Sequence, residues 1–564
     1  MGLEGTMERG GRTDTLKETA TAAILFGVSF SLYLFFGSHS LWDAEAMYAE
    51  VPREMLSTGN LFYPTLNFAP FLYKPPLYFW ANMASMALLG QNMLALRLPT
   101  AVFAAGTVVL AFLIGRRVSP RAGLYSGAVM ATLFGFTFHT AMLLPDYPLA
   151  FFVCASVLFF IKAINGERGG VAGVYASLAL AVMTKGFIGL VLPGLAFLSY
   201  MALEKRWDVA RRFASAWGIL VFLLITVPWH VMMELKNPDF LYNFIINEQV
   251  LRFFNRRFPP DWDSVPTSLF IPITLGWLLP WSFFLLKAVS RGSFREAGTA
   301  LKVSLLWGLS GMIFLAVSSS KMEYYALPVL PAFSVAVGSW WAGLAGRDGL
   351  SWAKSGALAL AIFAAAGLAA LKGLEGVMRS DLELSAADAS GLMAVAVRSL
   401  AALLAGGVIG FLFIRRGRAA PAFWSVLASA MLFSLASQGM MRYITPSLSS
   451  AEAAKSIASI SRPGDLVVVD GGHEFEYSTT YCFYLKDRVL ILLNDGNPVL
   501  SIRPQEGAGF LLDDEEFRRI WGSGKRAFFI TERDPASAKI AGLPDCAFRK
   551  VFERTGRTVF INRM

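Results

Sequence analysis

The sequence predicts a polytopic α-helical membrane protein that carries a small α/β domain at its C-terminal end. Of the 564 residues, 55% are hydrophobic and 16% are charged, and the mean hydropathy is +0.52, whereas soluble domains carry about 25% charged residues. The apolar residues come in blocks of about twenty, the length that a membrane-spanning helix requires. Residues 452–564 contain no such block. This composition excludes a protein that is soluble throughout, a disordered chain and a fibrous repeat.

We expect about thirteen membrane-spanning helices from the apolar blocks. The first is the run Ala20–Gly37, which lacks the small-residue cleavage site of a signal peptide and leads into aromatic sequence. The further spans are expected near residues 98–115, 122–143, 147–164, 171–184, 187–203, 214–232, 266–288, 300–318, 325–345, 353–371, 396–414 and 421–438.

Clusters of Lys and Arg orient these spans, because positive residues are retained on the cytoplasmic side of a membrane. The clusters fall in alternate short loops and comprise Arg116, Arg117 and Arg121, then Lys162 and Arg168, then Lys205, Arg206, Arg211 and Arg212, then Lys287, Arg291 and Arg295, and finally Arg415, Arg416 and Arg418. We therefore expect a cytoplasmic N-terminus in a bacterial inner membrane. An odd number of spans then places the C-terminal domain in the periplasm.

We divide the chain after residue 445. Residues 1–445 are expected to form the membrane domain, with two long outer loops at 38–97 and 233–265. Residues 446–564 are expected to form a periplasmic α/β domain, because short β-branched or aromatic runs alternate there with turns and one charged helix. The runs are Leu466–Val469, Val489–Leu493, Ala527–Thr531 and Thr558–Asn562, and the helix is Asp513–Trp521. This alternation favours a partly parallel sheet but does not give the order of its strands.

Asp43 and Glu45 follow the first span directly, at the outer boundary of the membrane. A partly desolvated carboxylate there can have a raised pKa and act as a base on a hydroxyl or as a metal ligand. Alternatively, the two acids open an interfacial helix, whose dipole favours acidic residues in the first turn. The residues alone leave both interpretations open.

Two further outer residues are candidates for binding or catalysis. Lys74 stands between aromatic residues and the pair Pro75-Pro76, and a cation fixed near the headgroups suits a phosphate. The alternative is a lysine that snorkels through an aromatic belt. Asp146 lies in a tight outer turn between two apolar spans; an acid at that depth is costly and therefore a functional candidate, although it is also a common turn residue.

Charged residues recur in the later outer segments. Glu248 and Arg252 stand at positions i and i+4 of a helical pattern and can simply pair with each other. Lys185 and Lys321 lie in two further outer turns. Basic residues thus recur at one membrane face, where an anionic lipid headgroup would lie.

The order of these motifs resembles the bacterial 4-amino-4-deoxy-L-arabinose (lipid A) transferases and the wider protein-mannosyltransferase superfamily. The resemblance covers about residues 20–345 and rests on Tyr48-Ala49-Glu50 with Arg53-Glu54-Met55, Lys74-Pro75, Asp146, Glu248 with Arg252-Phe253, Lys321–Tyr325 and Leu327-Pro328. It implies a GT-C fold and an inverting glycosyltransferase of the membrane. Such an enzyme moves a sugar from a polyprenyl-phosphate donor to a lipid (lipid A or lipopolysaccharide-like) or another envelope acceptor at the outer face.

The resemblance also implies roles for individual residues. Asp43, Glu45 and Asp146 are the expected catalytic acids. The donor phosphate is expected to contact Lys74, Arg252, Tyr325 and Lys321. The expected substrate contacts are Tyr48, Tyr73 and Glu248.

Four departures from the family pattern affect these expectations. Met47 precedes Tyr48 where the aminoarabinose enzymes carry Arg, Ala44 separates the two acids that are adjacent in those enzymes, and Tyr73 and Gln249 stand where they carry Glu and His. The loss of two such ligands argues against zinc and leaves a divalent metal as an open expectation. The identity of the sugar and of the acceptor stays open for the same reason.

The same residues also bear on other classes of function. A protein O-glycosyltransferase of the mannosyltransferase kind fits the same motifs. A lipid or solute transporter would also use boundary charges, but we find no internal repeat of the kind that transporters show. A receptor or scaffold leaves the charged outer loops unexplained. Nucleic-acid binding is not expected, because the net charge of +10 is distributed among the loops that orient the spans.

Overall fold

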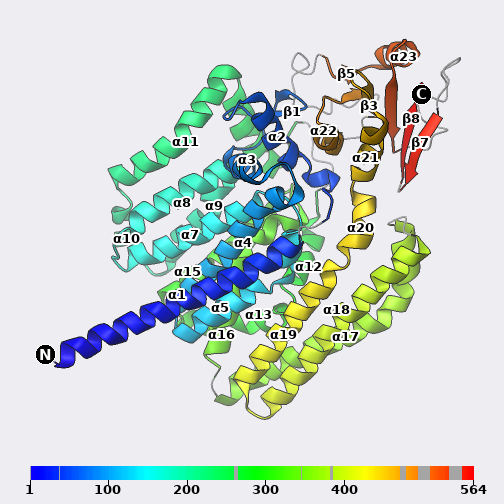
Figure 1. Ribbon diagram of the computed structural model, residues 1–564. Helices are drawn as coiled ribbons and strands as arrows, with labels where there is room; N and C mark the ends of the chain where they lie inside the picture. The colour runs from blue at the N-terminus through cyan, green and yellow to red at the C-terminus, as the bar shows by residue number, and fades with distance from the viewer. Residues whose placement is uncertain are drawn as a thin grey trace.

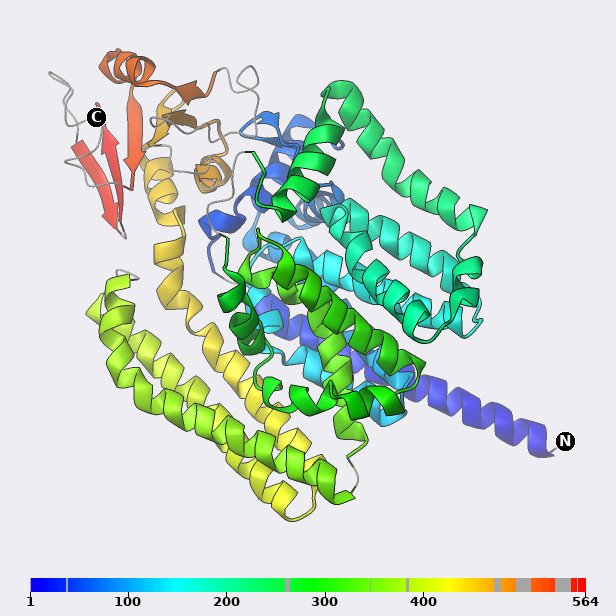
Figure 2. The ribbon, with the colours of Figure 1, turned by 180° about the vertical axis from the view of Figure 1, so that it is seen from behind.

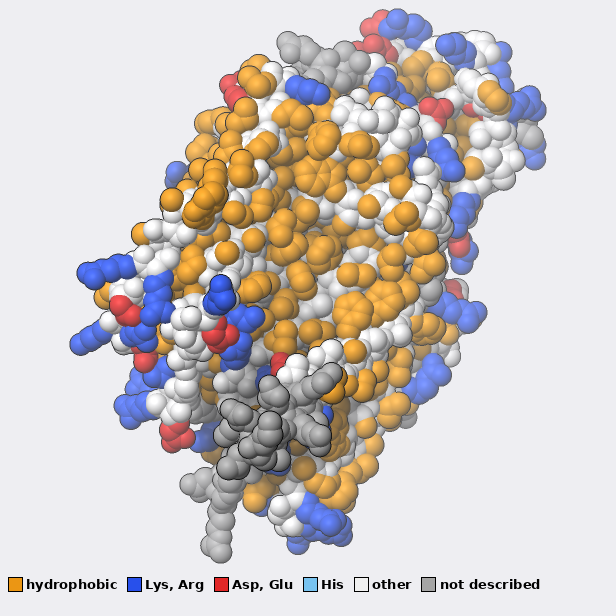
Figure 3. Space-filling model, turned by 60° about the vertical axis from the view of Figure 1, so that its left-hand side comes forward, with side chains coloured by type: hydrophobic (Ala, Val, Ile, Leu, Met, Phe, Trp, Pro, Cys, Tyr) orange, Lys and Arg blue, Asp and Glu red, His pale blue; other side chains and the backbone are white. Residues whose placement is uncertain are grey.

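The computed structural model describes residues 2–36, 39–258, 264–344, 346–381, 385–470, 478–492, 509–532, 549–554 and 556–563. This part of the chain forms a block of helices with a small β-sheet at one end (Figure 1). In both ribbon views the N-terminal helix extends from the block on the side away from the sheet (Figures 1 and 2). Apolar side chains cover the middle of the face drawn in Figure 3, and charged side chains gather towards its ends. We call the end that carries the sheet the sheet end.

Most of the described residues are helical. In chain order the helices are α1 (Gly2–Phe36), η1 (Asp43–Glu45), α2 (Met47–Thr58), α3 (Leu77–Leu89), α4 (Met93–Arg116), α5 (Pro120–Ala131), α6 (Phe134–His139), α7 (Asp146–Ile164), α8 (Gly170–Lys185), α9 (Ile188–Leu203), α10 (Trp207–Arg212), α11 (Ala216–Lys236), η2 (Tyr242–Leu251), α12 (Thr267–Trp277), α13 (Ser282–Ala288), α14 (Arg291–Glu296), α15 (Thr299–Val317), η3 (Glu323–Val329), α16 (Leu330–Ala342), α17 (Gly346–Asp381), α18 (Ala386–Arg415), α19 (Ala419–Gln438), α20 (Met441–Leu448), α21 (Ala451–Ile460), α22 (Thr479–Leu485) and α23 (Asp514–Gly522). The interior of the block is one continuous cluster of buried apolar side chains.

Nine helices of the described chain are long and apolar enough to cross a membrane, and α12 and α13 reach that length and apolarity only together, with a bend of 100° between them. The chain is therefore a multi-pass membrane protein. The predicted spans 171–184 and 187–203 correspond to α8 and α9, which have 16 residues each. The predicted span 122–143 divides into α5 and α6. Because of these short and broken helices, the count of thirteen is not confirmed.

The break between α5 and α6 has a local cause. The Thr132 hydroxyl bonds back to the Ala128 carbonyl at 2.9 Å, which competes with the helical ladder. The same hydroxyl receives the indole N–H of Trp281 at 3.1 Å, and the Phe134 N–H bonds the Leu279 carbonyl at 3.1 Å. The break in α5–α6 therefore pairs with the bend between α12 and α13, so two irregular segments satisfy each other's polar groups.

Loops that were predicted to share the cytoplasmic side lie at the end of the block opposite the sheet. Arg116, at the end of α4, pairs with Glu18 of α1 at 2.8 Å. Arg117 pairs with Glu167, which lies between α7 and α8. The first ion pair joins the N-terminal helix to the loop after α4, and the second joins that loop to the one between α7 and α8. We call this end the basic end.

The sheet belongs to the C-terminal region and is partly parallel, as predicted. Its strands are β3 (Leu466–Asp470), β4 (Leu490–Leu492), β5 (Leu511–Leu512), β6 (Ala527–Thr531), β7 (Arg549–Arg554) and β8 (Arg557–Ile561), in the order β5-β4-β3-β6-β8-β7. Strands β3 to β6 run parallel, and β8 pairs antiparallel with both β6 and β7. The sequence did not predict β5, which has two residues, or β7, which is a charged edge strand.

The two long loops predicted at the outer side contain regular structure at the sheet end. Residues 38–97 include η1, α2, the hairpin of β1 (Thr65–Leu66) with β2 (Ala69–Pro70), and α3. The hairpin contacts the C-terminal region through Asn67, whose side chain bonds the N–H and the carbonyl of Val489 at 3.0 and 2.8 Å. The boundary predicted after residue 445 falls inside α20, which connects the helical block to the sheet.

Candidate active site

Two adjoining cavities lie at the sheet end of the block, and both are lined by Lys74, Lys185, Glu248 and Arg252. The polar chamber, of about 180 Å³, is further lined by Tyr48, Tyr73, Arg257 and Glu323. The apolar chamber, of about 140 Å³, is further lined by Leu149, Phe187, Ile188, Val191, Phe314 and Leu315. The cavity lined by charged side chains therefore adjoins an apolar cavity between helices.

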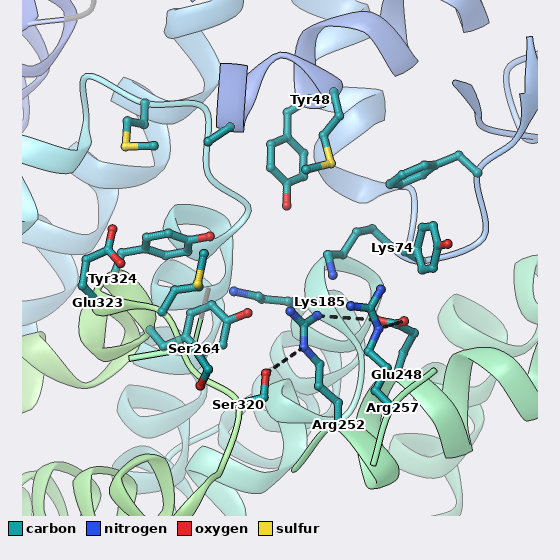
Figure 4. A pocket seen from close by; sticks show the side chains of 17 residues that line it. Tyr48, Lys74, Lys185, Glu248, Arg252, Arg257, Ser264, Ser320, Glu323 and Tyr324 are labelled. Atoms are coloured by element: carbon teal, nitrogen blue, oxygen red, sulfur yellow. Dashed lines mark hydrogen bonds and ion pairs between the residues drawn. The ribbon is translucent and has the colours of Figure 1, made fainter. Parts of the chain in front are cut away.

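Lys74 points its ammonium group into the polar chamber (Figure 4). The segment before α3 holds it there, since Pro75 and Pro76 restrict the backbone on one side and the Phe71 and Tyr73 rings pack together at 5.3 Å on the other. Burial lowers the pKa of Lys74 to about 8, and the nearby charge of Arg252 adds to this effect. Within the described chain this ammonium has no ion pair. It is a cation held ready for an anion.

Two arginines share the carboxylate of Glu248. Arg257 donates from Nε to Glu248 at 2.5 Å, and Arg252 donates from Nη1 at 3.4 Å. Arg252 also donates from Nε to the Ser320 hydroxyl at 3.3 Å. The i, i+4 pairing expected from the sequence therefore forms, but Arg257 is the closer partner. Glu248 lies in η2, a π-helix, and the two guanidinium groups leave this side of the polar chamber positively charged.

Asp146 and Lys185 form the most symmetrical ion pair of the site. The Lys185 ammonium lies 2.7 Å from both carboxylate oxygens of Asp146 and 4.2 Å from the centre of the Tyr325 ring. Gly186 makes this turn feasible, because its φ is +79° and a Cβ there would lie 3.0 Å from the amide of Gln249. Asp146 thus positions a cation between the two chambers.

The predicted tyrosines all line the site. Tyr48 projects its hydroxyl from α2 into the polar chamber (Figure 4). Burial, and then the charge of Asp146, raise the pKa of Tyr48 well above its ordinary value, so its hydroxyl stays protonated and can donate a hydrogen bond. Tyr73 lines the polar chamber, and Tyr325 lines both chambers.

Asp43 lies outside both chambers, at the contact between the first loop and the C-terminal region. Its carboxylate accepts from the N–H and hydroxyl of Ser450, both at 2.9 Å, from the Thr480 hydroxyl at 2.7 Å and from Arg557 at 2.8 Å. Burial raises the pKa of Asp43, and Arg557 opposes this shift. We call these four residues the latch.

Glu45 also lies outside both chambers. Its carboxylate pairs with the buried Arg97 and accepts from the backbone N–H groups of Leu143 at 2.5 Å and Trp42 at 2.9 Å. Ala44, between the two acids, does line the polar chamber. In the 3₁₀ turn η1, successive side chains point in different directions, so the two acids predicted as catalytic are directed away from the cavity. Their arrangement favours the structural interpretation that the sequence had left open.

Lys321 does not reach either chamber, in contrast to the phosphate contact expected for it. Its ammonium donates to the Ser318 carbonyl, to the Ala316 carbonyl at 3.2 Å and to the Thr267 hydroxyl at 2.8 Å. Because these three oxygens satisfy the charge inside the protein, Lys321 holds the segment between α15 and η3 in place.

Three charged residues that line the polar chamber were not among the predicted site residues: Lys185, Arg257 and Glu323. Two of them carried a signal in the sequence. Lys185 precedes a glycine in a short turn between apolar helices, and Arg257 is a positive residue on the predicted outer side. Glu323 follows Lys321 in the same motif, and only the structure separates the lysine from the chamber and directs the glutamate into it.

The donor groups at the site do not match a metal centre. Among the described residues, no three His, Cys, Asp or Glu side chains lie close enough to hold an ion. Glu248 and Asp146 are each neutralised by Arg or Lys, and a cation-rich cavity disfavours a further cation.

The same arrangement of helices and C-terminal sheet occurs in a solved structure of ArnT from Cupriavidus metallidurans bound to undecaprenyl phosphate. The two structures have a TM-score of 0.79 and 22% sequence identity, and the match covers 97% of this chain and 98% of ArnT. The chain has the fold of ArnT. The GT-C architecture predicted from the motifs is thereby confirmed.

Sequence relatives agree with the expected resemblance. The chain is 28% identical over 315 residues to an undecaprenyl phosphate-alpha-4-amino-4-deoxy-L-arabinose arabinosyl transferase of Shewanella sediminis, a match that covers 54% of this chain and 56% of the relative. A similarly named protein of Pseudomonas paraeruginosa is 26% identical over 81% of this chain and 86% of its own length. A family model described as dolichyl-phosphate-mannose-protein mannosyltransferase matches residues 73–232.

Proposed function

We propose that the protein is an inverting glycosyltransferase that takes a sugar from a polyprenyl-phosphate donor and transfers it to a lipid acceptor of the bacterial envelope. The relatives named above, which share the fold or the motifs, are named for undecaprenyl phosphate and an arabinosyl transfer. The donor class proposed here follows theirs.

The single observation that carries the proposal is the junction of the two chambers. A polyprenyl phosphate has an anionic head and a long apolar tail, and each needs a different environment. Lys74, Arg252 and Arg257 supply positive charge around the polar chamber, while Phe187 and Leu315 are among the side chains that line the adjoining apolar chamber. A phosphate in the first and a prenyl chain entering the second would satisfy both requirements.

The proposed chemistry needs little more than charge stabilisation and positioning. The bond between the anomeric carbon of the sugar and the phosphate oxygen breaks, and negative charge grows on the phosphate. Lys74 and Arg252 would meet that charge with groups already in place, which is worth a factor of about 10²–10³ in rate for each well-placed donor. Asp146 would act through Lys185, by fixing its ammonium beside Tyr325. The hydroxyl of Tyr48 would orient the sugar.

We propose a location in the bacterial inner membrane, with a cytoplasmic N-terminus and a periplasmic C-terminal region. The ion pairs of Arg116 with Glu18 and Arg117 with Glu167 bring two of the Lys- and Arg-rich loops together with the N-terminal helix at the basic end. The positive-inside rule assigns that end to the cytoplasm. The chambers, at the sheet end, would then open on the periplasmic side.

A second candidate from the same reaction class is a protein O-glycosyltransferase. The match of residues 73–232 to the protein mannosyltransferase model favours it. Such an enzyme would use the same donor site and differ only in the acceptor. A transporter or flippase, which is a different class, would bind a polyprenyl phosphate and leave its glycosidic bond intact.

The proposal is tested by incubating purified protein with radiolabelled sugars on polyprenyl phosphates and with envelope lipids or proteins as acceptors. We expect label to move from the donor to a lipid. Label that moves to protein would establish the second candidate, and movement of intact donor across a liposome membrane without cleavage would establish a transporter instead.

Neighbouring arginines provide a matched control for this assay. Arg257 lines the polar chamber, whereas Arg256 is exposed and lines neither chamber. We expect Arg257→Ala to lower transfer strongly and Arg256→Ala to leave it unchanged. Equal losses in both variants would show that the effect is one of overall charge and would argue against a phosphate site in the polar chamber.

A further inference from the structure

The carboxylates that line the two chambers differ in whether they already form an ion pair with a Lys or Arg side chain. Glu248 is shared by Arg252 and Arg257, and both oxygens of Asp146 contact the ammonium of Lys185. Each of these carboxylate oxygens therefore already accepts from a cationic group rather than facing a substrate. Neither is therefore suited to remove a proton from a substrate.

Glu323 is different. It lines the polar chamber from the first residue of η3, and within the described chain its carboxylate takes part in no ion pair or hydrogen bond. Its backbone is well fixed, because the indole of Trp277 donates to the Glu323 carbonyl at 3.1 Å and Lys321 anchors the preceding segment through the Thr267 hydroxyl at 2.8 Å. The structure thus holds an unoccupied acid on a rigid support.

The position of Glu323 relative to Lys74 and Arg257 suits a base in an inverting reaction. Figure 4 shows Glu323 on the opposite side of the polar chamber from Lys74 and Arg257. In an inverting displacement the nucleophile approaches the anomeric carbon from the face opposite the leaving group, so the base and the leaving phosphate lie on opposite sides of the sugar. A phosphate beside Lys74 and Arg257 would leave the side facing Glu323 for the acceptor.

We propose that Glu323 is the general base of the reaction and that the acceptor group is a hydroxyl; this inference rests on the proposed glycosyl transfer. The acceptor oxygen forms a bond to the anomeric carbon while its proton passes to the Glu323 carboxylate. The bond from that carbon to the phosphate oxygen breaks, its electron pair stays on the phosphate, and a polyprenyl phosphate leaves. The proton on Glu323 then returns to water.

The same residue defines the class of acceptor. A phosphate acceptor carries no proton that must be removed near neutral pH, and the charge of Glu323 would repel it. A hydroxyl acceptor needs a base and gains from that charge. The negative group on the acceptor side therefore selects a sugar or side-chain hydroxyl over a phosphate.

The test compares Glu323→Gln with wild type, using one donor and two nucleophiles. With a hydroxyl acceptor we expect the variant to lose transfer by about 100-fold or more. Azide is a nucleophile without a proton to remove, so azide-dependent consumption of donor should be similar in the two proteins. Glu323→Asp should regain part of the lost transfer. The Kd for polyprenyl phosphate, measured on the same preparations, should stay within about twofold, since the phosphate site is intact.

Glu234→Gln is the matched control. It is the same change from glutamate to glutamine, but Glu234, in the predicted outer loop 233–265, lines neither chamber. It should leave both reactions unchanged. Equal losses with azide and with hydroxyl acceptors in Glu323→Gln would overturn the role as base, and a product linked through an acceptor phosphate would overturn the acceptor class. If wild type cleaves no donor with either nucleophile, the proposed function itself fails and this inference falls with it.

Discussion

The latch and the polar chamber are both clusters of charged residues at the sheet end, yet they differ in how fully those charges are satisfied. In the latch, Asp43 accepts four hydrogen bonds, including one from Arg557 at 2.8 Å. In the chamber, Lys74 and Glu323 are without ion pairs in the described chain. A satisfied charge holds two segments together, whereas a charge left open is available to a substrate. Charge satisfaction therefore separates structural acids from functional ones.

The largest expected effect is on the latch. Asp43→Ala or Arg557→Ala leaves one buried charge without its partner, which typically costs about 3–5 kcal/mol. We expect a lower free energy of unfolding, together with faster proteolysis of the C-terminal region, measured on protein in detergent. The double variant should lose less than the sum of the two single variants.

A contrary result would change the role of Asp43. If Asp43→Asn kept the stability and proteolysis pattern of wild type but abolished transfer, Asp43 would belong to the catalytic machinery, as the sequence first suggested.

The second largest effect is expected from removing a charged side chain of the polar chamber. Lys74→Ala should lower transfer by about 10²–10³-fold, because one preorganised donor to the developing phosphate charge is lost. The control is Lys236→Ala, which removes an exposed lysine that lies 5.0 Å from the centre of the Tyr63 ring and lines neither chamber. Rates are measured with a single polyprenyl-phosphate donor, and unchanged transfer in Lys74→Ala would remove this lysine from the phosphate site.

A smaller effect is expected from pH. The pKa of Lys74 is lowered to about 8 in the free protein, and a bound phosphate favours the protonated form. Binding therefore takes up a proton above pH 8, and the Kd for polyprenyl phosphate should rise by about tenfold per pH unit there. Below pH 8 Lys74 is already protonated, and its contribution to the Kd should be flat. The Lys74→Ala variant should lack the rise, and a rise of equal slope in that variant would assign it to another group.

The smallest effect is expected where an ion pair is open to water. Lys550 and Glu553 pair on β7 with about half of each side chain exposed, at 49% and 56%. Because water screens such a pair, Lys550→Ala should change the free energy of unfolding by less than about 0.5 kcal/mol. A loss comparable to that of Arg557→Ala would show that pairing itself, rather than burial, decides the stability of this region.

Most of the site residues predicted from the sequence line the two chambers, and those that lie elsewhere share one feature. Lys74, Arg252, Tyr48, Tyr73, Tyr325 and Glu248 were predicted and all line the polar chamber. Asp43, Glu45 and Lys321 were predicted by the same reasoning and do not line either chamber. A charged residue in an unfavourable topological position signals that it has a partner, but the sequence does not say whether that partner is a substrate or another part of the protein.

The sequence by itself determined that the chain crosses a membrane several times, that its basic loops alternate and that a partly parallel sheet follows the helices. These features depend on composition and periodicity along the chain, which are local properties. Only the tertiary structure decided the roles of the charges. Asp43 finds Arg557, more than five hundred residues later in the chain (|i−j| = 514), while Glu323 finds an open cavity. The pairing of buried charges depends on which distant segments meet, and no local pattern encodes it.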